Sequence, residues 1–366
     1  ETIEGLESDA SDDADTQSSL AEFGATRAGT IERLMDIYQE FLAIENEDIE
    51  DAREMERKYR EIEQDDLRQR LVGMANVATA EDFGVDVPSG AYERMARSLE
   101  ADDEWADVEQ QDWYQTGQSL ADDHDFFHWK LEFPEVFYDR DGGMAEQSGY
   151  DAVVGNPPYV FIDSIPEELR GYYAESFNTW DYRYDIYGLF IELAINTISN
   201  QSQLGYIVPH NLLNNSSFSA LRQKIVAEST NIRLIDFTAS VFEDASNEPM
   251  LVLFEHTDIP DQTPTLQSAL ISPDTLADST VPFSKYDATA IESLPENPFI
   301  VRGWEWVGKV LRHNKATTLG NHVDAVQGLR TGNNTERLSN KKETENHRKA
   351  LAGEDIHRYG YQWNNT

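Results

Sequence analysis

The chain has 366 residues, which is enough for about two or three compact units. It carries 69 acidic and 29 basic residues, giving a formal net charge of -40 and a sequence pI near 4.3. Charge repulsion of this size destabilises a compact fold, but it is screened where the Debye length is about 3 Å, in about 1 M salt. The acid excess is therefore typical of a halophilic cytoplasm, with an acidic protein from an ordinary cell as the alternative.

Several further classes are excluded by what the sequence lacks. It has no cysteine, so a disulfide framework, a thiolate nucleophile and a cysteine-bound zinc are impossible, and no metal site is predicted. No apolar stretch has membrane-spanning length and no secretion signal is visible, so we predict a cytoplasmic protein. The chain begins at Glu1 without an initiator Met, so we expect either processing or a piece of a longer protein.

The first third of the chain is acidic and helical in pattern. Residues 1–25 are acidic and Ser-rich, which predicts disorder. Residues 26–125 are predicted as a helical spacer, because apolar residues recur there at spacings of three and four, as in Leu34, Ile37, Phe41 and Ile44. Residues 1–130 hold 36 acidic and 11 basic residues, a net of -25. We therefore expect no nucleic acid to bind to this part.

Residues 126–260 change to an alternation of strand and helix patterns. Short apolar runs predict strands at 150–155, 204–209, 231–237 and 249–254. Helical patterns lie between them at 165–177, 184–198 and 218–228. This alternation predicts an α/β fold with a largely parallel sheet, in which ligands bind at the carboxyl ends of the strands. The loop after the first strand is therefore the place to look for chemistry.

The last hundred residues differ again. Residues 261–300 are rich in Pro, Ser and Thr, which is typical of a linker or of peripheral loops. Residues 301–366 hold 11 basic and 7 acidic residues, a net of +4 that reverses the charge of the rest. This reversal makes 301–366 the candidate for a polyanion-binding segment.

The first predicted strand ends in Asn156-Pro157-Pro158-Tyr159. The two prolines stiffen the turn. An exocyclic amine on a nucleobase is a poor nucleophile, because its lone pair is delocalised into the ring. Two acceptors aimed at its hydrogens, the side-chain oxygen of Asn156 and the carbonyl of Pro157, can pyramidalise the nitrogen and hold it in line with a methyl donor. Tyr159 offers a flat face on which a base can stack.

A plainer interpretation of the same loop exists. Asn-Pro and Pro-Pro are ordinary turn dipeptides, and Tyr159 could simply cover the end of the strand. The surrounding sequence is needed to decide between the two.

The segments FFHWKLEFPEVF (126–137) and GYDAVVGNPPYV (149–160) together resemble the type IIG restriction–modification and BREX-associated N6-adenine DNA methyltransferases. The resemblance continues through YDIYGLFIELAI (184–195), GYIVPHNLL (205–213) and FTASVFEDASNEPMLVLF (237–254), and ends in AVQGLRTGNN and LAGEDIHRYGY. It implies transfer of a methyl group from S-adenosylmethionine to N6 of an adenine flipped out of double-stranded DNA. It also implies a catalytic subdomain over 126–260 and the start of a DNA target-recognition domain over 301–366.

The resemblance also implies roles for single residues. Asn156 and Pro157 would contact the target amine, Pro158 would stiffen the loop, and Tyr159 and Phe242 would stack on the flipped base. Asp185 and Tyr187 would line the pocket, although a helix cap explains Asp185 equally well, and Phe242 could be a core residue. Phosphate contacts would come from Arg330, Lys341, Lys342, Arg348 and Lys349, for which a solvated basic face is the alternative.

One expected element is missing upstream of the loop. The family binds S-adenosylmethionine mainly through a Gly-rich loop that precedes this strand, but Gly73 and Gly84 are isolated and Gly142-Gly143 lies in a polar turn. We therefore expect the second half of a Rossmann-like methyltransferase sheet, preceded by the helical spacer. Its partner would be the missing N-terminal methyltransferase half. The isolated chain is expected not to methylate DNA.

Three alternatives stay open from the sequence. Protein-glutamine and ribosomal-RNA adenine methyltransferases also use Asn-Pro-Pro-Tyr, but they are compact and lack a long helical spacer. Cytosine-N4 enzymes more often have Ser in the first position. A catalytically inert DNA-binding remnant would keep the same motif.

Overall fold

The computed structural model describes residues 48–181, 183–239, 248–258, 264–277, 281–287 and 296–301, together with short stretches within 29–44 and at 241, 291, 294, 356–357 and 360–361. The chain separates into two compact units, 1–309 and 310–366. The disorder predicted for 1–25 and the turn-rich stretch AVQGLRTGNN lie outside the described residues. In the second unit, β7 (Ile356–His357) pairs antiparallel with β8 (Gly360–Tyr361).

The predicted helical region is confirmed between residues 49 and 124. Its helices are α3 (Ile49–Glu63), α4 (Asp66–Asp82), α5 (Ala91–Ser98), α6 (Asp102–Glu109) and α7 (Asp112–His124). Helix α3 begins with a capping box, in which Asp48 and Asp51 each accept a hydrogen bond from the other's main-chain N–H. The helices have an apolar core of their own, which includes Leu71, Met74, Val77, Met95, Leu99, Trp105 and Val108. The region is thus a packed helical bundle, which a plain spacer would not need.

Two single-turn helices lead from this bundle to the sheet. They are α8 (Trp129–Glu132) and α9 (Pro134–Phe137), and Pro134 opens α9 at a position where proline is tolerated. The rings of Trp129, Phe133 and Phe137 each lie about 6 Å from the ring of Tyr150, at 6.0, 6.0 and 5.6 Å. The HWKLEFPEVF segment therefore packs against the residue with which the first strand begins.

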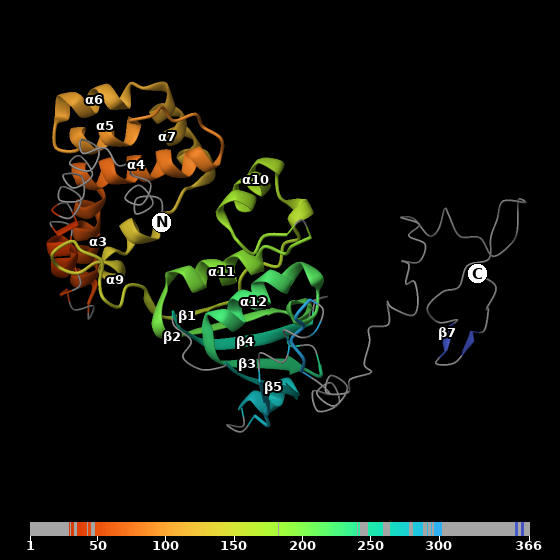
Figure 1. Ribbon diagram of the computed structural model, residues 1–366. Coiled ribbons are helices and arrows are strands. Elements are labelled where there is room, and N and C mark those ends of the chain that lie inside the picture. Colours follow the sequence, from red (N-terminus) through yellow and green to blue (C-terminus); the bar gives the residue numbers. More distant parts are fainter. Residues whose placement is uncertain are drawn as a thin grey trace, which may run out of the picture. The chain divides into compact units, whose positions relative to one another are not determined.

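A six-stranded mixed sheet follows, which confirms the α/β prediction (Figure 1). Its strands are β1 (Tyr150–Gly155), β2 (Ile198–Pro209), β3 (Ser229–Phe237), β4 (Pro249–His256), β5 (Thr265–Ile271) and β6 (Ser284–Asp287), in the order β1-β2-β4-β3-β5-β6. The helices associated with them are α10 (Glu167–Ser176), α11 (Tyr187–Thr197) and α12 (Ser219–Ala227). All four strands and all three helices predicted after residue 149 are present.

The prediction of a largely parallel sheet is wrong. Only β1–β2 and β3–β5 are parallel, whereas β2–β4, β3–β4 and β5–β6 are antiparallel. The connection from β3 to β4 runs from 238 to 248, which is too short for the crossover of about a dozen or more residues that a parallel return needs. Strand β4 therefore folds back and lies between β2 and β3.

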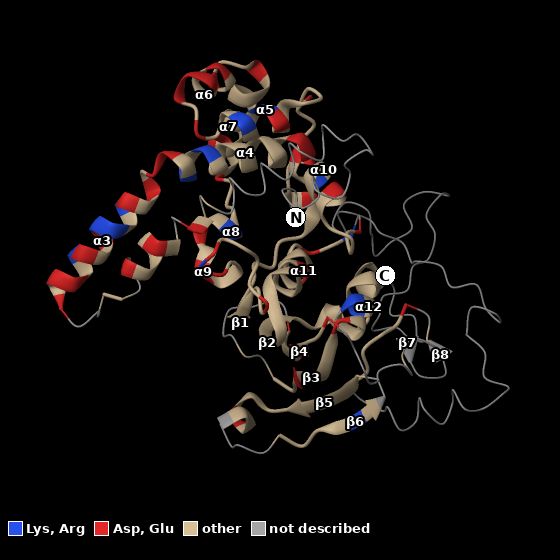
Figure 2. Ribbon diagram, turned by 60° about the vertical axis from the view of Figure 1, so that its left-hand side comes forward, with Lys and Arg blue, Asp and Glu red and all other residues tan. Residues whose placement is uncertain are grey.

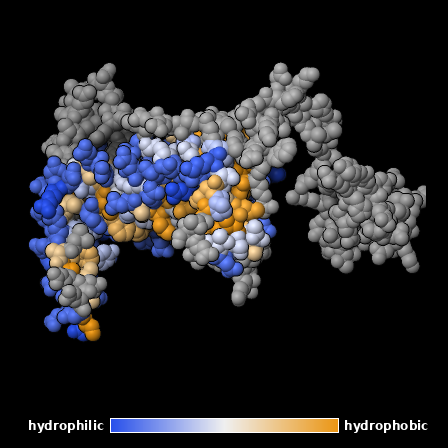
Figure 3. All heavy atoms as spheres, turned by 90° about the horizontal axis from the view of Figure 1, so that it is seen from below, coloured by the Kyte–Doolittle hydropathy of each residue, from blue (hydrophilic) through white to orange (hydrophobic). Residues whose placement is uncertain are grey.

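Successive residues of a strand face opposite sides of the sheet, and each side has an apolar layer. Met250, Val252 and Phe254 of β4 join the main core with α11 and α12, while Leu251 and Leu253 join a smaller cluster on the other face. The strands are mostly free of charged side chains, whereas Asp and Glu recur along α3 to α7 (Figure 2). Hydrophobic residues also reach the surface between hydrophilic areas (Figure 3). None of the described helices is both long and apolar enough to cross a membrane.

The region 261–300 also differs from the sequence interpretation. Residues 265–271 and 284–287 form β5 and β6 of the same sheet, so this stretch is a part of the fold rather than a linker. The polar composition of this stretch suggested a linker, but β5 buries polar residues: Gln267 and Ser268 are 9% and 1% exposed. At the opposite edge, β1 pairs with β2 and with no other described strand.

Candidate active site

The Asn-Pro-Pro-Tyr loop leaves the sheet at the carboxyl end of β1. The last residue of β1, Gly155, is in register with Tyr206 of the parallel strand β2. Beyond it, Asn156 and Pro158 are exposed, Pro157 is buried and Tyr159 is half-buried. Within the described part of the chain, the side chain of Asn156 makes no hydrogen bond. An exposed amide on a loop stiffened by a buried proline can be presented to a ligand without reorganisation.

The ring of Tyr159 is held at two points. Its hydroxyl donates a hydrogen bond to the main-chain oxygen of Ile207 in β2, 3.0 Å away. Its ring lies edge-on to that of Tyr187, with centroids 6.3 Å apart and planes at 79°. Burial raises the pKa of Tyr159, so its hydroxyl remains a protonated donor at neutral pH. These contacts fix the plane of the ring beside Asn156.

The main chain after Tyr159 is tied to the segment that precedes α11. The N–H of Ile186 donates to the oxygen of Val160 at 2.9 Å, and the N–H of Ile162 donates to the oxygen of Tyr184 at 3.0 Å. Phe161 and Asp185 form an isolated antiparallel bridge at the same place. The position of the loop therefore depends on how residues 184–186 are held.

A buried carboxylate holds that segment. Glu192 of α11 is fully buried and accepts hydrogen bonds from the N–H of Asn178 (3.0 Å) and from the N–H and hydroxyl of Thr179 (3.0 and 2.6 Å). The Thr179 hydroxyl also lies 2.8 Å from the hydroxyl of Tyr184. Glu192 thus has three hydrogen-bond donors in place of the water that it loses on burial. Through Tyr184 this network supports the Asn-Pro-Pro-Tyr loop.

Asp185 and Tyr187 are joined by a residue that the sequence did not single out. Asn211, in the 3-10 turn η2 (His210–Leu213) after β2, donates from Nδ2 to a carboxylate oxygen of Asp185 at 2.9 Å. Its Oδ1 accepts from the Tyr187 hydroxyl at 2.6 Å. Burial and the neighbouring Asp185 raise the pKa of Tyr187 well above its usual value, which keeps it a donor.

The helix-cap alternative for Asp185 is wrong. The residue before the first turn of α11 is Ile186, and no side chain caps that helix. The carboxylate of Asp185 is instead engaged by Asn211, in a turn that follows β2. This arrangement leaves Asp185 as a residue of the loop cluster at the carboxyl ends of β1 and β2.

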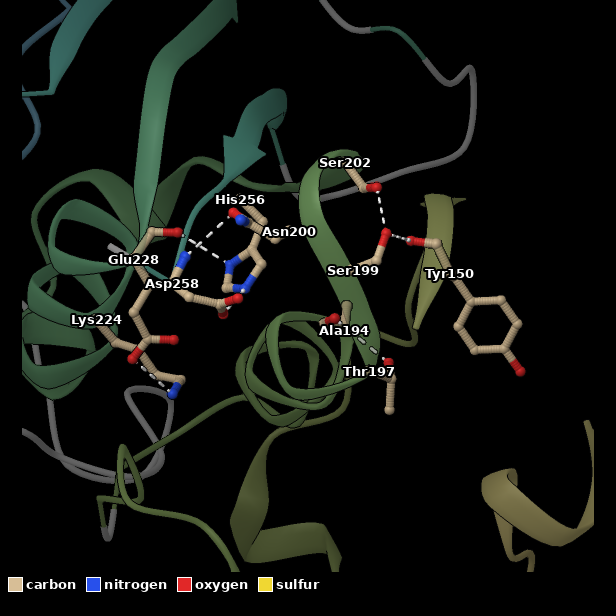
Figure 4. Close-up of polar contacts among 10 residues, drawn as sticks. All are labelled: Tyr150, Ala194, Thr197, Ser199, Asn200, Ser202, Lys224, Glu228, His256 and Asp258. Carbon is tan, nitrogen blue, oxygen red and sulfur yellow. Dashed lines mark hydrogen bonds and ion pairs between the residues drawn. The ribbon is translucent and has the colours of Figure 1, made fainter. Parts of the chain in front are cut away.

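The start of β1 is fixed as firmly as its end. Gly149 has a φ of +119°, and a Cβ there would lie 2.6 to 2.8 Å from the main chain of residues 197–199. Ser199 donates from its hydroxyl to the oxygen of Tyr150 and shares a second hydrogen bond with Ser202, at 3.3 and 2.6 Å (Figure 4). Only glycine fits between β1 and the end of α11, so the strand enters the sheet in one register.

The structure brings part of the predicted site together. Asn156, Pro157, Pro158 and Tyr159 share one loop, and Tyr159 contacts Tyr187, which connects through Asn211 to Asp185. The other predicted site residues lie outside the described residues: Phe242, Arg330, Lys341, Lys342, Arg348 and Lys349. Sequence reasoning missed Asn211, Glu192 and Thr179. The only signal for Asn211 was a polar residue between a strand end and two leucines.

A pocket among the described residues lies along α3 and is lined by charged and polar side chains far from Asn156 in the sequence, namely Arg53, Glu56, Arg57, Arg60, Glu61 and Gln64. Within the same residues, no group of three or more His, Asp or Glu could hold a metal ion. No glycine that the structure describes upstream of β1 lies between a strand and a helix, which is where the expected donor-binding loop would be.

Comparisons with known proteins find relatives of the part of the chain that contains the loop. Residues 81–242 match the family described as Eco57I restriction-modification methylase. The chain is 30% identical over 86 residues to the type II methyltransferase M.TthHB8I of Thermus thermophilus, which covers 22% of this chain and 20% of that protein. It is 36% identical over 85 residues to the type II methyltransferase M.PaeR7I of Pseudomonas aeruginosa, covering 23% and 15%. The chain thus matches about a fifth or less of the length of these relatives.

Solved structures resemble this chain only weakly. A nuclease-deletion mutant of the Type ISP restriction-modification enzyme LlaGI gives a TM-score of 0.33 at 11% identity, over 59% of this chain and 24% of that chain. The type IIG restriction endonuclease BpuSI gives 0.31 at 12% identity, over 66% and 32%. Scores this low carry no argument, so the assignment depends on the sequence matches. The matched stretch contains the loop from Asn156 to Tyr159, so this part of the chain is similar to restriction-modification methyltransferases.

Proposed function

We propose that the loop from Asn156 to Tyr159 is the target-base site of a site-specific DNA methyltransferase acting on N6 of adenine. The observation that carries this proposal is the position of Asn156. Its exposed amide, without a hydrogen bond in the described chain, stands at the carboxyl end of β1, three residues before a tyrosine whose ring is anchored to β2. An acceptor and a stacking face are thus placed side by side on a stiff loop.

In the proposed mechanism the chain acts on the base and not on the donor. The Asn156 side-chain oxygen and the Pro157 carbonyl accept the two amino hydrogens and draw the nitrogen lone pair out of conjugation with the ring. Because the loop is already in place, little reorganisation is needed when the base arrives. No strong general base is required, since the amine becomes acidic as it is methylated and its proton can pass to solvent.

A base inside a duplex cannot reach this loop. The adenine must be flipped out, at a cost of a few kcal/mol. Stacking on the anchored ring of Tyr159 offsets about 1–3 kcal/mol of that cost. The rest of the cost of flipping would be offset by Phe242, proposed as the second stacking face, and by the proposed phosphate contacts. These contacts are Arg330, Lys341, Lys342, Arg348 and Lys349.

The family favours DNA over the other substrates that share the motif. The relatives matched here are type II methyltransferases of restriction-modification systems. The match to the family begins at residue 81, at the end of α4, and so includes α5, α6 and α7 of the helical bundle. Compact glutamine and ribosomal-RNA methyltransferases have no need of such a bundle, so we propose DNA as the substrate and adenine as the base.

S-adenosylmethionine is the proposed methyl donor, held by a partner half. Strand β1 is an edge strand, and the side chain of Val154, one residue before its end, is 84% exposed. An exposed edge strand presents unpaired main-chain groups to which another strand can add. A partner half of the methyltransferase sheet, carrying the glycine loop for the donor, would pair there and bring the donor to the carboxyl end of β1.

Two measurements test this function. The chain is combined with a donor-binding half of the same family and with unmethylated DNA, and the digested DNA is analysed by nucleoside mass spectrometry. N6-methyladenine is expected, whereas N4-methylcytosine, or neither product, would refute the assignment. Calorimetry of S-adenosylmethionine with the chain alone, in molar KCl, should show no binding; a clear binding isotherm would contradict the need for a partner half.

A further inference from the structure

A fully buried arginine contacts the turn that carries Asn211 of the candidate site. Arg222 of α12 is 0% exposed, and no carboxylate among the described residues forms an ion pair with it. Burial lowers its pKa to about 10, so it remains charged at neutral pH. Burying a charge without a counter-ion is costly unless its hydrogens are all engaged. The hydrogen-bond acceptors around Arg222 must therefore compensate for the missing counter-ion.

All partners of the guanidinium are main-chain oxygens from two separate segments. Nη1 donates to the oxygens of Leu212 and Asn215, both at 2.9 Å. Nε donates to Asn297 at 2.8 Å, and Nη2 donates to Glu296 at 2.6 Å. Leu212 directly follows Asn211, the residue that joins Asp185 to Tyr187. Arg222 therefore connects the Asn211 turn to the stretch that precedes residues 310–366.

The second segment, at Glu296 and Asn297, has an unusual main-chain conformation. Glu296 and Asn297 have φ values of 64° and 48°, a left-handed conformation that is rare for two consecutive residues other than glycine. This conformation directs two successive carbonyls at one guanidinium. The segment is also held by the N–H of Phe299, which donates to Leu213 at 2.8 Å, and by Asn297 Nδ2, which donates to the Ser219 hydroxyl at 3.3 Å. Strain of this kind persists only where the surroundings impose it.

We propose that Arg222 is a positioning residue that holds the Asn211 turn of the site and the Glu296–Asn297 turn in one fixed relation. Ordering of either turn then favours ordering of the other. This rests on the proposed function only in treating Asp185 and Tyr187 as parts of the site. The five N–H groups of a planar guanidinium can serve four carbonyls at once, whereas a lysine ammonium has only three N–H groups at a single point.

The test uses the full chain labelled with 15N only at asparagine, in molar KCl. The side-chain amide of Asn211 reports on the site turn, and that of Asn297 reports on the second turn. Asn76, which donates to Gln118, and Asn231, which donates to Glu255, are internal controls in the bundle and at the far end of β3. Substitution of each asparagine assigns its signal. None of these signals depends on methylation, so failure of the proposed function leaves the test intact.

In R222K, the Asn211 and Asn297 side-chain signals should both leave their wild-type positions, while Asn76 and Asn231 stay. The matched control is Lys224→Ala, which removes a cation of the same helix that pairs with Glu228 (Figure 4) and should move neither reporter. If R222K keeps the Asn211 signal in place, the proposal is refuted. A shift of the Asn297 signal alone would refute it as well.

A second pair of variants decides the matter if R222K does not fold. Asn297→Gly keeps the left-handed turn, because glycine adopts positive φ readily, and should leave the Asn211 signal unchanged. Asn297→Val opposes that conformation and loses the same hydrogen bond to Ser219 as Asn297→Gly does. It should displace the Asn211 signal although Asn211 lies in another segment. An Asn211 signal that is identical in the two variants would show that the turns are independent.

Discussion

The hydroxyl of Tyr159 donates a hydrogen bond to the main-chain oxygen of Ile207, 3.0 Å away in the neighbouring strand. The two residues are 48 positions apart, and the bond ties the loop after β1 to β2. The ring itself is only partly buried, so it is held in place without being enclosed by the core. We propose that its accessible part receives a base. If it does, the ring and the hydroxyl should make separable contributions.

Substitutions at Tyr159 separate the two contributions. Tyr159→Phe removes the bond to Ile207 and should cost about 1 kcal/mol of folding stability while retaining most base capture. Tyr159→Ala removes the stacking face and should weaken capture of a flipped base by about 1–3 kcal/mol. The measurement is 2-aminopurine fluorescence at the target position of a DNA duplex bound by the reconstituted enzyme. Equal fluorescence in the alanine variant and the wild type would contradict stacking on this ring.

Asn156→Ala should abolish methylation without unfolding the chain. The side chain is exposed and makes no hydrogen bond in the described chain, so the stability change should be within about 0.5 kcal/mol. Loss of an acceptor aimed at the reacting amine should lower kcat by about 100-fold or more. The matched control is Asn196→Ala, an exposed asparagine on α11. Substantial activity in Asn156→Ala would refute its role.

The Glu192 network should behave as one unit. Glu192→Gln replaces an acceptor by an NH2 group that faces main-chain donors, and should destabilise the chain by about 2–4 kcal/mol. Thr179→Val removes one donor and should cost about 1 kcal/mol. Because the two side chains are in direct contact, 2.6 Å apart, the double variant should cost less than the sum of the single variants. Urea denaturation in molar KCl measures all three; strict additivity would argue against a coupled pair.

Much of the fold was predictable from local patterns. Short apolar runs identified β1 to β4, although β1 is exposed along one side, and helical spacing identified α10 to α12. Strand direction was not predictable, since the insertion of β4 between β2 and β3 depends on pairing across the sheet. Strand β5 was missed because Gln267 and Ser268 are polar and yet buried, and Ser268 is satisfied by the oxygen of Val301, 33 residues away.

The site was predictable only where the chemistry is local. Asn156, Pro157, Pro158 and Tyr159 are consecutive, so their sequence is itself the motif. Asn211 and Glu192 act through partners 13 to 26 positions away, and no spacing rule relates a turn after β2 to a residue before α11. Their roles become visible only when the folded chain brings these segments together.

Gly149→Ala should disrupt the start of β1. A methyl group at this position meets the main chain of residues 197–199 at 2.6 to 2.8 Å, which a backbone cannot avoid without shifting. The matched control is Gly84→Ala, whose φ of +88° carries a similar conformational cost but whose Cβ would meet nothing within 4 Å. The control should lose about 1 kcal/mol and Gly149→Ala considerably more, as measured by urea denaturation. Equal losses would mean that β1 can shift away from α11.

The helical bundle should lose stability as the pH falls from 7 to 5. Burial and the nearby Arg68 lower the pKa of His128 to about 4, and its Nε2 faces Oδ1 of Asn76 at 2.7 Å. In the unfolded chain the pKa of histidine is about 6.5. Below that pH the imidazole is protonated in the unfolded state but stays neutral in the folded state. The free energy of unfolding, which has its full value above pH 6.5, therefore falls progressively towards pH 4. Between pH 7 and 5 this amounts to about 1–2 kcal/mol. His128→Gln can still donate to Asn76 but cannot titrate, so subtracting its pH dependence, measured by urea denaturation, isolates His128 from the many carboxylates. Identical pH dependence in the two proteins would place the His128 proton in water rather than in the bundle.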